Sequence, residues 1–154
     1  MKKINIILCF IIFFFLTACS SNSTISPKDK KLSETEQKFK TKTVQNIEMK
    51  LKNIETTESG NDEKQNIVVF TMKFQNIDST VIGIGGGDFK IKADDKIYSI
   101  YAEGNNIGQE IEQEKTADGK LYFELPTSVK KATLQYIPGD KILGKWDVKI
   151  PEAK

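Results

Sequence analysis

The chain has 154 residues, a length that favours one domain, and its 23 basic residues are all Lys, with neither Arg nor His. The lack of His removes the commonest general base and metal ligand, and the lack of Arg removes the bidentate phosphate donor. Without Lys2 and Lys3, which lie in a segment that we expect to be removed, 21 Lys balance 21 acidic residues. The net charge therefore predicts no nucleic-acid partner.

The amino terminus has the pattern of a bacterial export signal. Two lysines precede residues 6–16, an apolar run too short to span a bilayer, for which a helix needs about 20 residues. The following Leu16-Thr17-Ala18-Cys19 resembles the lipobox of bacterial prolipoproteins, whose cysteine receives a diacylglyceryl group before a peptidase cuts in front of it. We expect a signal peptide over residues 1–18, cleavage between Ala18 and Cys19, and lipidation, including palmitate, at Cys19. The alternative is an ordinary secretory signal in which Cys19 is incidental.

The predicted anchor also sets location and redox chemistry. Two acyl chains hold a protein stably on a membrane, so we expect the extracytoplasmic face of the cell membrane. The sequence leaves open whether this is a Gram-positive plasma membrane or an outer membrane. Cys9 lies within the leader, so the mature chain has no free thiol and no intrachain disulfide.

Residues 19–42 are rich in Ser, Thr, Lys and Glu, and their low hydrophobicity predicts a disordered tether. Residues 43–154 alternate apolar and polar side chains with a period of two, which indicates β-strands. Strands are expected at 47–52, 67–75, 89–92, 97–101, 120–125, 132–136 and 145–150. Seven or so short strands over this length predict an all-β, immunoglobulin-like antiparallel β-sandwich, with a small barrel as the alternative.

Four segments carry a family resemblance: residues 70–76 (FTMKFQN), 87–91 (GDFKI), 119–126 (GKLYFELP) and 134–138 (LQYIP). They are similar to a domain family of unknown function that is common in Gram-positive lipoproteins and has the immunoprotective extracellular immunoglobulin-like fold. The resemblance covers about residues 44–150, implies the same sandwich, and brings no catalytic residues. Two segments depart from the family pattern, the glycine-rich 83–87 and the long polar 105–116.

Three motifs invite a chemical interpretation, and each has a simpler one. The glycines of 83–87 lack the spacing and the following helix of a phosphate-binding loop, which favours a flexible connection or bulge. Asp88, Asp94 and Asp95 lack calcium-loop spacing, which favours turns, with a hairpin turn at Asp94-Asp95. Glu110, Glu112 and Glu114 alternate, as catalytic carboxylates could, but a soluble edge or loop is the better interpretation.

Aromatic residues offer a possible binding surface. Trp146 is in phase with Val148 and is expected in the core, whereas Tyr98 and Tyr122 are out of phase with their apolar neighbours. If exposed, these two tyrosines are candidates for a sugar- or peptide-binding surface.

These features predict a non-enzymatic binding or interaction module, with no cofactor and no metal. Its expected partners are the membrane, through the anchor, and an unidentified protein or cell-wall component. The alternative is a small-ligand carrier or sensor lipoprotein, which requires an apolar cavity of several hundred Å³.

Overall fold

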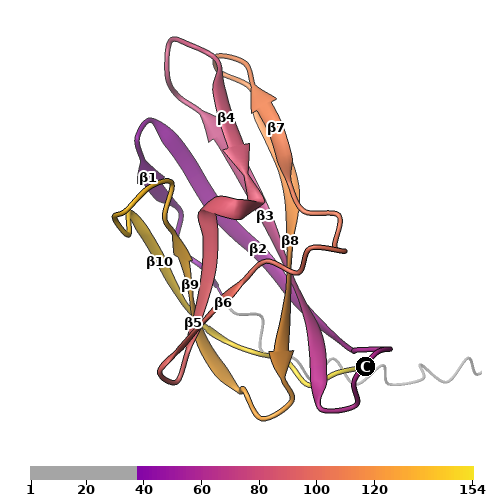
Figure 1. Cartoon of the computed structure of the whole chain (residues 1–154). Helices are drawn as coiled ribbons and strands as arrows, with labels where there is room; N and C mark the ends of the chain where they lie inside the picture. The colour runs from indigo at the N-terminus through magenta and orange to yellow at the C-terminus, as the bar shows by residue number, and fades with distance from the viewer. Residues whose placement is uncertain (1–37) are drawn as a thin grey trace, which may run out of the picture. The chain divides into compact units, whose positions relative to one another are not determined.

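Strands account for most of the chain that the structure describes. The computed structural model describes residues 38–154, which form an antiparallel β-sandwich (Figure 1). The predicted leader, the Ala18–Cys19 cleavage site and residues 19–37 lie outside the described residues. Within residues 38–154, no helix is long and apolar enough to cross a membrane.

Two four-stranded sheets form the sandwich. The first has the order β1 (Lys42–Val44), β2 (Ile47–Glu58), β3 (Gln65–Asn76), β8 (Thr116–Pro126). The second has the order β10 (Gly144–Lys149), β9 (Lys131–Tyr136), β5 (Phe89–Ala93), β6 (Lys96–Ser99). A separate two-stranded ribbon pairs β4 (Ile82–Gly85) with β7 (Gly108–Ile111), and a 3-10 turn, η1 (Gly86–Asp88), joins β4 to β5.

The predicted all-β sandwich is confirmed, with ten strands in the described residues rather than about seven. The seven expected strands correspond to β2, β3, β5, β6, β8, β9 and β10. The three additional strands, β1, β4 and β7, have only three or four residues each, too few to show a period of two. The strand expected at 67–75 is central in the first sheet, because β3 lies between β2 and β8.

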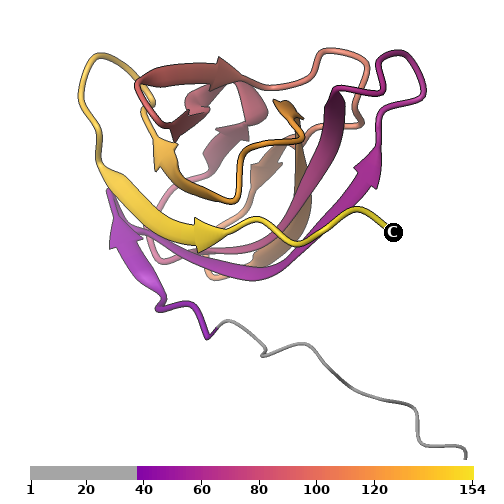
Figure 2. The same ribbon diagram turned by 90° about the horizontal axis from the view of Figure 1, so that it is seen from below.

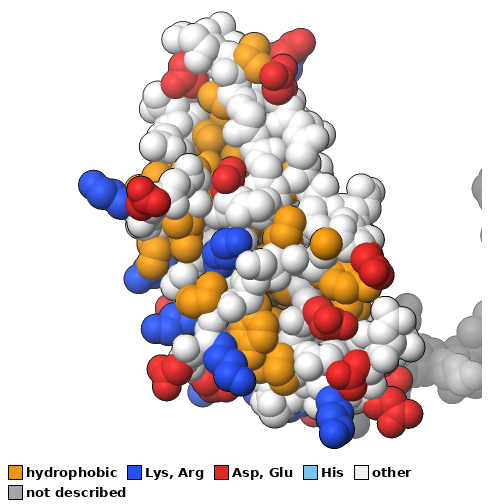
Figure 3. Space-filling model, in the orientation of Figure 1, with side chains coloured by type: hydrophobic (Ala, Val, Ile, Leu, Met, Phe, Trp, Pro, Cys, Tyr) orange, Lys and Arg blue, Asp and Glu red, His pale blue; other side chains and the backbone are white. Residues whose placement is uncertain are grey.

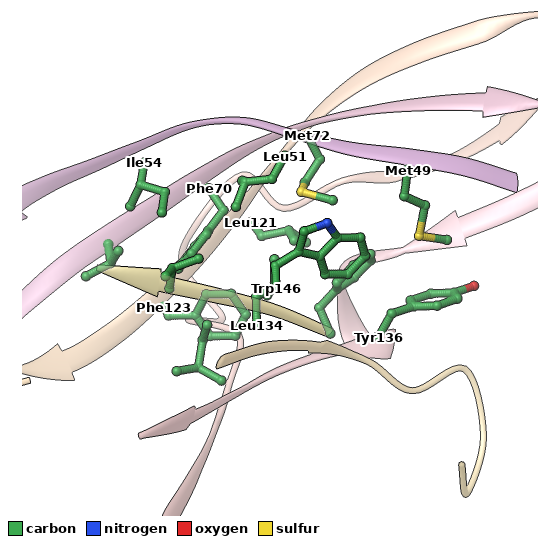
Figure 4. Packing of buried hydrophobic residues seen from close by; sticks show 14 of the residues in the cluster. Met49, Leu51, Ile54, Phe70, Met72, Leu121, Phe123, Leu134, Tyr136 and Trp146 are labelled. Atoms are coloured by element: carbon green, nitrogen blue, oxygen red, sulfur yellow. The ribbon is translucent and has the colours of Figure 1, made fainter. Parts of the chain in front are cut away.

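The core lies between the two sheets and is built from the alternating positions that the sequence indicates. Four phenylalanines are fully buried, and Phe70 and Phe123 meet edge to face with ring centroids 5.6 Å apart. Phe74 of the first sheet meets Phe89 of the second at 6.2 Å, so aromatic contacts join the sheets. In Figure 4 Trp146 points from the second sheet into this apolar layer, as predicted for a core residue.

Contacts between the sheets close both sides of the sandwich. On one side Lys42 of β1 places its ammonium group 6.0 Å from the ring centroid of Trp146 on β10, and Figure 2 shows these strands side by side. Phe39, in the predicted tether, is half-buried against the core, so the described fold begins before residue 43. On the other side residues 100–107 cross from β6 to β8, and the Tyr101 amide donates to the Tyr122 carbonyl at 2.7 Å.

A bulge explains why β2 is longer than expected. The pairing of β2 with β3 shifts between Leu51 and Asn53, so the inward positions change from odd numbers to even ones. Ile54 and Thr56 are buried after the shift, and the strand continues to Glu58, six residues beyond its expected end at 52. An extra residue in one strand interrupts simple alternation in the sequence.

The expected phase of β6 is wrong. Tyr98 pairs with the buried Ile91 and therefore faces the core, whereas Ile97 pairs with Lys92 and is 57% exposed. The two-residue turn at Asp94-Asp95, confirmed as a hairpin, sets this register. A shift of one residue in register exchanges the two faces of a strand.

Candidate functional site

The outer face of the second sheet gathers basic side chains from three neighbouring strands. Alternate residues of β5, β9 and β10 point away from the core, and their pairing aligns them in rows across the sheet. Five lysines and one aspartate thus occupy eight outward positions. These positions are Lys90 and Lys92 on β5, Lys131, Thr133 and Gln135 on β9, and Lys145, Asp147 and Lys149 on β10.

This face is concave. An open hollow of about 1050 Å³, here called the basic hollow, is lined by Lys92, Lys131, Thr133, Gln135, Lys145, Asp147 and Lys149, with Asp94 and other residues beside them. Ile97 and Ile142 also line it, although they are 57% and 44% exposed. Figure 3 shows lysine and hydrophobic side chains next to one another on the lower left of the view, over this sheet. The hollow thus combines positive charge with exposed apolar surface.

Polar side chains form the floor of the basic hollow. The Thr133 hydroxyl donates to Asp147 Oδ1 at 2.8 Å, across the β9–β10 pair. Gln135 is only 4% exposed although it points outward, because it lies between Lys90 and Lys145 in the same row. Lys90 Nζ donates to Ser99 Oγ at 3.1 Å. Ammonium groups beside hydroxyl and amide groups suit a ligand that has both anionic oxygens and hydroxyls.

Two lysines of the basic hollow lie directly opposite each other. Lys131 of β9 pairs in register with Lys149 of β10. Like charges at directly opposed positions of an antiparallel pair repel each other. An anionic ligand between the two ammonium groups would offset this repulsion.

The structure places the two predicted binding tyrosines on different faces. Tyr98 is half-buried and packs against the core from β6. Tyr122 points outward from β8, as expected, but it is half-buried because residues 101–106 cover it. A Cβ at Gly104 would lie 2.6 Å from Tyr122 Cγ, which shows how closely this segment approaches the ring. The two tyrosines therefore do not share one open surface.

The segment 100–107, here called the strap, is fixed to β8 by Asn106. The side-chain amide of Asn106 donates to the carbonyls of Tyr101 and Gly104, and its oxygen accepts from the Tyr122 amide at 2.8 Å. Ile107 packs directly on Gly119, where a Cβ would lie 2.7 Å from the Cβ of Ile107. The strap therefore requires glycine at its contact with β8.

The two segments that depart from the family pattern pair with each other. Residues 83–87, predicted as a flexible connection or bulge, contribute to β4, and β7 comes from 105–116. Asn76, fully buried at the end of β3, holds this ribbon: its amide donates to the carbonyls of Thr80 at 2.7 Å and Ile111 at 2.8 Å. These hydrogen bonds add to the burial of Ile84 and Ile111, through which the ribbon packs on the core.

The acidic motifs lie apart from one another. Glu110 is on β7, while Glu112 and Glu114 follow the strand, and all three are exposed. Within residues 38–154, no group of three or more Asp and Glu side chains could hold a metal ion. The hydrogen bond that the Tyr101 hydroxyl donates to Glu103 at 2.6 Å raises the pKa of Tyr101, but this pair lies outside the basic hollow.

The basic hollow is not apparent from the sequence. Each of its strands shows lysines at alternate positions, which is the ordinary pattern of a solvated face. Only the register of three strands brings these lysines together, and two of the strands are adjacent in space but distant in sequence. The available signal in the sequence was that two strands carry lysines opposite their buried apolar face. These lysines are Lys90, Lys92, Lys145 and Lys149.

Comparisons with known proteins identify a family and a fold. The family whose sequence pattern matches residues 28–147 is a domain of unknown function, DUF4352. None of the curated proteins matches the chain.

Three solved structures show the same architecture. A candidate lipoprotein of Bacillus subtilis, YcdA, is similar with a TM-score of 0.58 and 20% identity; the match covers 74% of this chain but only 39% of that one. A secreted protein of Mycobacterium tuberculosis, MPT63, has a TM-score of 0.54 and 15% identity over 66% of this chain and 82% of its own. An uncharacterised β-sandwich protein of Clostridium difficile has a TM-score of 0.51 and 14% identity over 75% and 92%. At these identities the likeness supports the fold alone.

Proposed function

Since the chain belongs to the DUF4352 family of domains of unknown function, we propose a function from its own geometry. The protein is a membrane-anchored extracytoplasmic lipoprotein, and its β-sandwich is a non-catalytic binding module. The basic hollow is the binding face.

One observation carries this proposal, the segregation of charge. Lysines and acids balance over the mature chain, yet five lysines and one aspartate share the eight outward positions of β5, β9 and β10. A uniformly solvated surface would mix the signs, whereas a surface that binds an anionic partner concentrates one sign. The concave shape supports contact with a ligand over several strands at once.

The lipobox sequence supports the anchor. Leu16-Thr17-Ala18 before Cys19 fits lipidation, with palmitate among the acyl chains, and the similar chain YcdA is described as a candidate lipoprotein. Residues 19–37 can span at most about 65 Å, so the module stays within that reach of the extracytoplasmic face of the cell membrane. We further assign the sandwich to the immunoglobulin-like class, because two antiparallel four-stranded sheets pack over one core.

The hollow favours an extended polar partner over a small apolar ligand. A carrier of small apolar molecules needs a cavity lined mainly by apolar side chains. The basic hollow is open and is lined by four lysines, and the space between the sheets is occupied by large buried side chains such as Phe70, Phe74 and Phe89.

Mass spectrometry of the protein from its native membrane tests the anchor. We expect the mature chain to begin at Cys19 and to carry a diacylglyceryl group, and we expect Cys19→Ser to prevent both processing and membrane retention. An unmodified Cys19 in membrane-associated protein would contradict the anchor.

Site-specific cross-linking on intact cells tests the binding face. A photo-reactive residue at Thr133, in the hollow, is compared with one at Lys50, on the exposed face of β2. We expect cross-linked products to an envelope component from position 133 and few from position 50. Equal products from both positions, or products from position 50 alone, would contradict the assignment of the hollow.

A further inference from the structure

The basic hollow carries the chemistry to select one class of ligand. We propose, on the basis of the binding function proposed above, that it holds a linear polyol-phosphate or sugar-phosphate polymer, in which phosphodiester groups alternate with hydroxyl-bearing units. The polymer lies across β5, β9 and β10.

The arrangement of the lysines fits repeated charges rather than a single anion. Residues two apart on a strand are about 7 Å apart and residues four apart about 13 Å, while neighbouring strands are about 5 Å apart. Within the hollow, Lys145 and Lys149 of β10 therefore start from backbone positions at the second spacing, and Lys131 of β9 lies directly opposite Lys149. A single phosphate can contact only some of them, whereas a chain of phosphates can contact several in succession.

The type of cation also fits a flexible polymer. Lys is a compact point charge with three rotatable donors on a flexible stem, so it binds phosphate oxygens without a fixed bidentate geometry. The lysines of the hollow can thus follow a chain whose phosphates vary in orientation.

Uncharged groups on the floor suit the hydroxyls between the phosphates. The Thr133 hydroxyl gives its hydrogen to Asp147, which leaves the Thr133 oxygen able to accept from a ligand hydroxyl. Asp147 can accept a second hydrogen bond from the ligand. A polymer of phosphate groups alone has no use for these acceptors.

Two other polyanions fit less well. Single-stranded nucleic acid is bound by stacking of its bases on aromatic side chains, and the eight outward positions of β5, β9 and β10 carry none. A flat bilayer surface reaches the rim of the hollow but not its floor, where the Thr133 and Asp147 side chains lie. Recessed polar groups favour a narrow chain.

Titration with poly(glycerol phosphate) tests the proposal. The mature lipidated chain is held in neutral detergent, and binding is measured by calorimetry over a range of salt concentrations. The triple variant Lys92→Glu/Lys131→Glu/Lys145→Glu reverses the hollow, and Lys50→Glu/Lys52→Glu/Lys64→Glu reverses three exposed lysines outside it. Both variants change the net charge equally, so their difference reports the hollow.

We expect the hollow variant to weaken binding at least about tenfold and to lower the slope of log Kd against log salt by about three, whereas the outer variant stays within about twofold. Lys→Arg at the same three hollow positions should retain binding within about threefold. Equal weakening in both Glu variants, or no binding by the native chain, would overturn the proposal. So would displacement of the polymer by oligo(dT) or by short-chain phosphatidylglycerol at equal phosphate concentration.

The cross-linking experiment separates this proposal from the function on which it rests. If poly(glycerol phosphate) does not bind but position 133 still cross-links to an envelope component, the polymer is the wrong ligand and the binding function stands. If neither occurs, both proposals are wrong.

Discussion

Lys131 on β9 and Lys149 on β10 lie directly opposite each other on the outer face of the second sheet. Opposed charges of opposite sign stabilise an antiparallel pair by roughly 0.2–1 kcal/mol, and like charges destabilise it. We expect Lys131→Glu to raise the free energy of unfolding by about 0.5 kcal/mol in urea titrations, and Lys131→Arg to leave it unchanged. The same Lys131→Glu should weaken ligand binding at the hollow. A lower free energy of unfolding in Lys131→Glu would show that the two opposed lysines do not destabilise the sheet.

Asn76 connects the β4–β7 ribbon to the sandwich through hydrogen bonds of its buried side chain. Its amide reaches the Ile111 carbonyl at 2.8 Å, and its oxygen accepts from the Asp78 amide at 2.7 Å. Asn76→Ala leaves the buried Ile111 carbonyl and the partly buried Asp78 amide without that partner, so we expect a loss of about 2–3 kcal/mol in urea unfolding. Amide exchange in β4 and β7 should accelerate more than in β9. The matched control, Gln75→Ala on the same strand, should change stability by less than about 0.5 kcal/mol.

The strap depends on a close contact at Gly119. A Cβ there would lie 2.7 Å from Ile107 Cβ, which cannot move without the backbone. We expect Gly119→Ala to destabilise the protein by about 1–3 kcal/mol in thermal unfolding, because overpacking displaces the strap. Gly83 has no atom within 4 Å of its Cβ position, so Gly83→Ala should be neutral or slightly stabilising. Equal effects of the two substitutions would contradict the close packing of the strap.

Asp78 links stability to acid pH. Hydrogen bonds from Asn46 first, and then from the Thr80 amide and hydroxyl, lower the pKa of Asp78 from the ordinary value of an aspartate. A depressed pKa in the folded state stabilises the fold above the unfolded pKa, and this contribution is lost as the pH falls through the folded pKa. NMR titration should give Asp78 a lower pKa in the native chain than in Asn46→Gly, a change that suits the positive φ of 62° at Asn46. An unchanged pKa in that variant would mean that Asn46 is not the main cause.

Much of the fold could be predicted because alternation and burial agree. Val68, Phe70, Met72 and Phe74 alternate in the sequence, and all four are fully buried. Where local pattern and register disagree, the prediction is wrong: Ile97 is more hydrophobic than Tyr98, yet the turn at Asp94-Asp95 places Tyr98 inside. The bulge after Leu51 made the predicted strand too short, because one extra residue moves the following apolar side chains out of the alternating pattern.

The candidate site could not be predicted because it depends on contacts between distant strands. Lys92 and Thr133 are neighbours only because β5 pairs with β9, and the sequence does not specify which strands pair. Asn76 likewise reads as a strand end, and its role follows from where Ile111 lies in space. The predicted tyrosine surface relied on phase alone, and phase could not show that the strap covers Tyr122.

Lysine footprinting on intact cells tests most directly the central claim that the basic hollow is the binding face of the protein. An amine-reactive reagent is applied to cells and, separately, to the protein extracted into neutral detergent, and modification is quantified at each lysine. We predict that Lys92, Lys131 and Lys145 are protected on cells relative to the extracted protein, while the exposed Lys50 and Lys52 react equally in both. Equal modification of all five lysines in the two preparations would contradict the account.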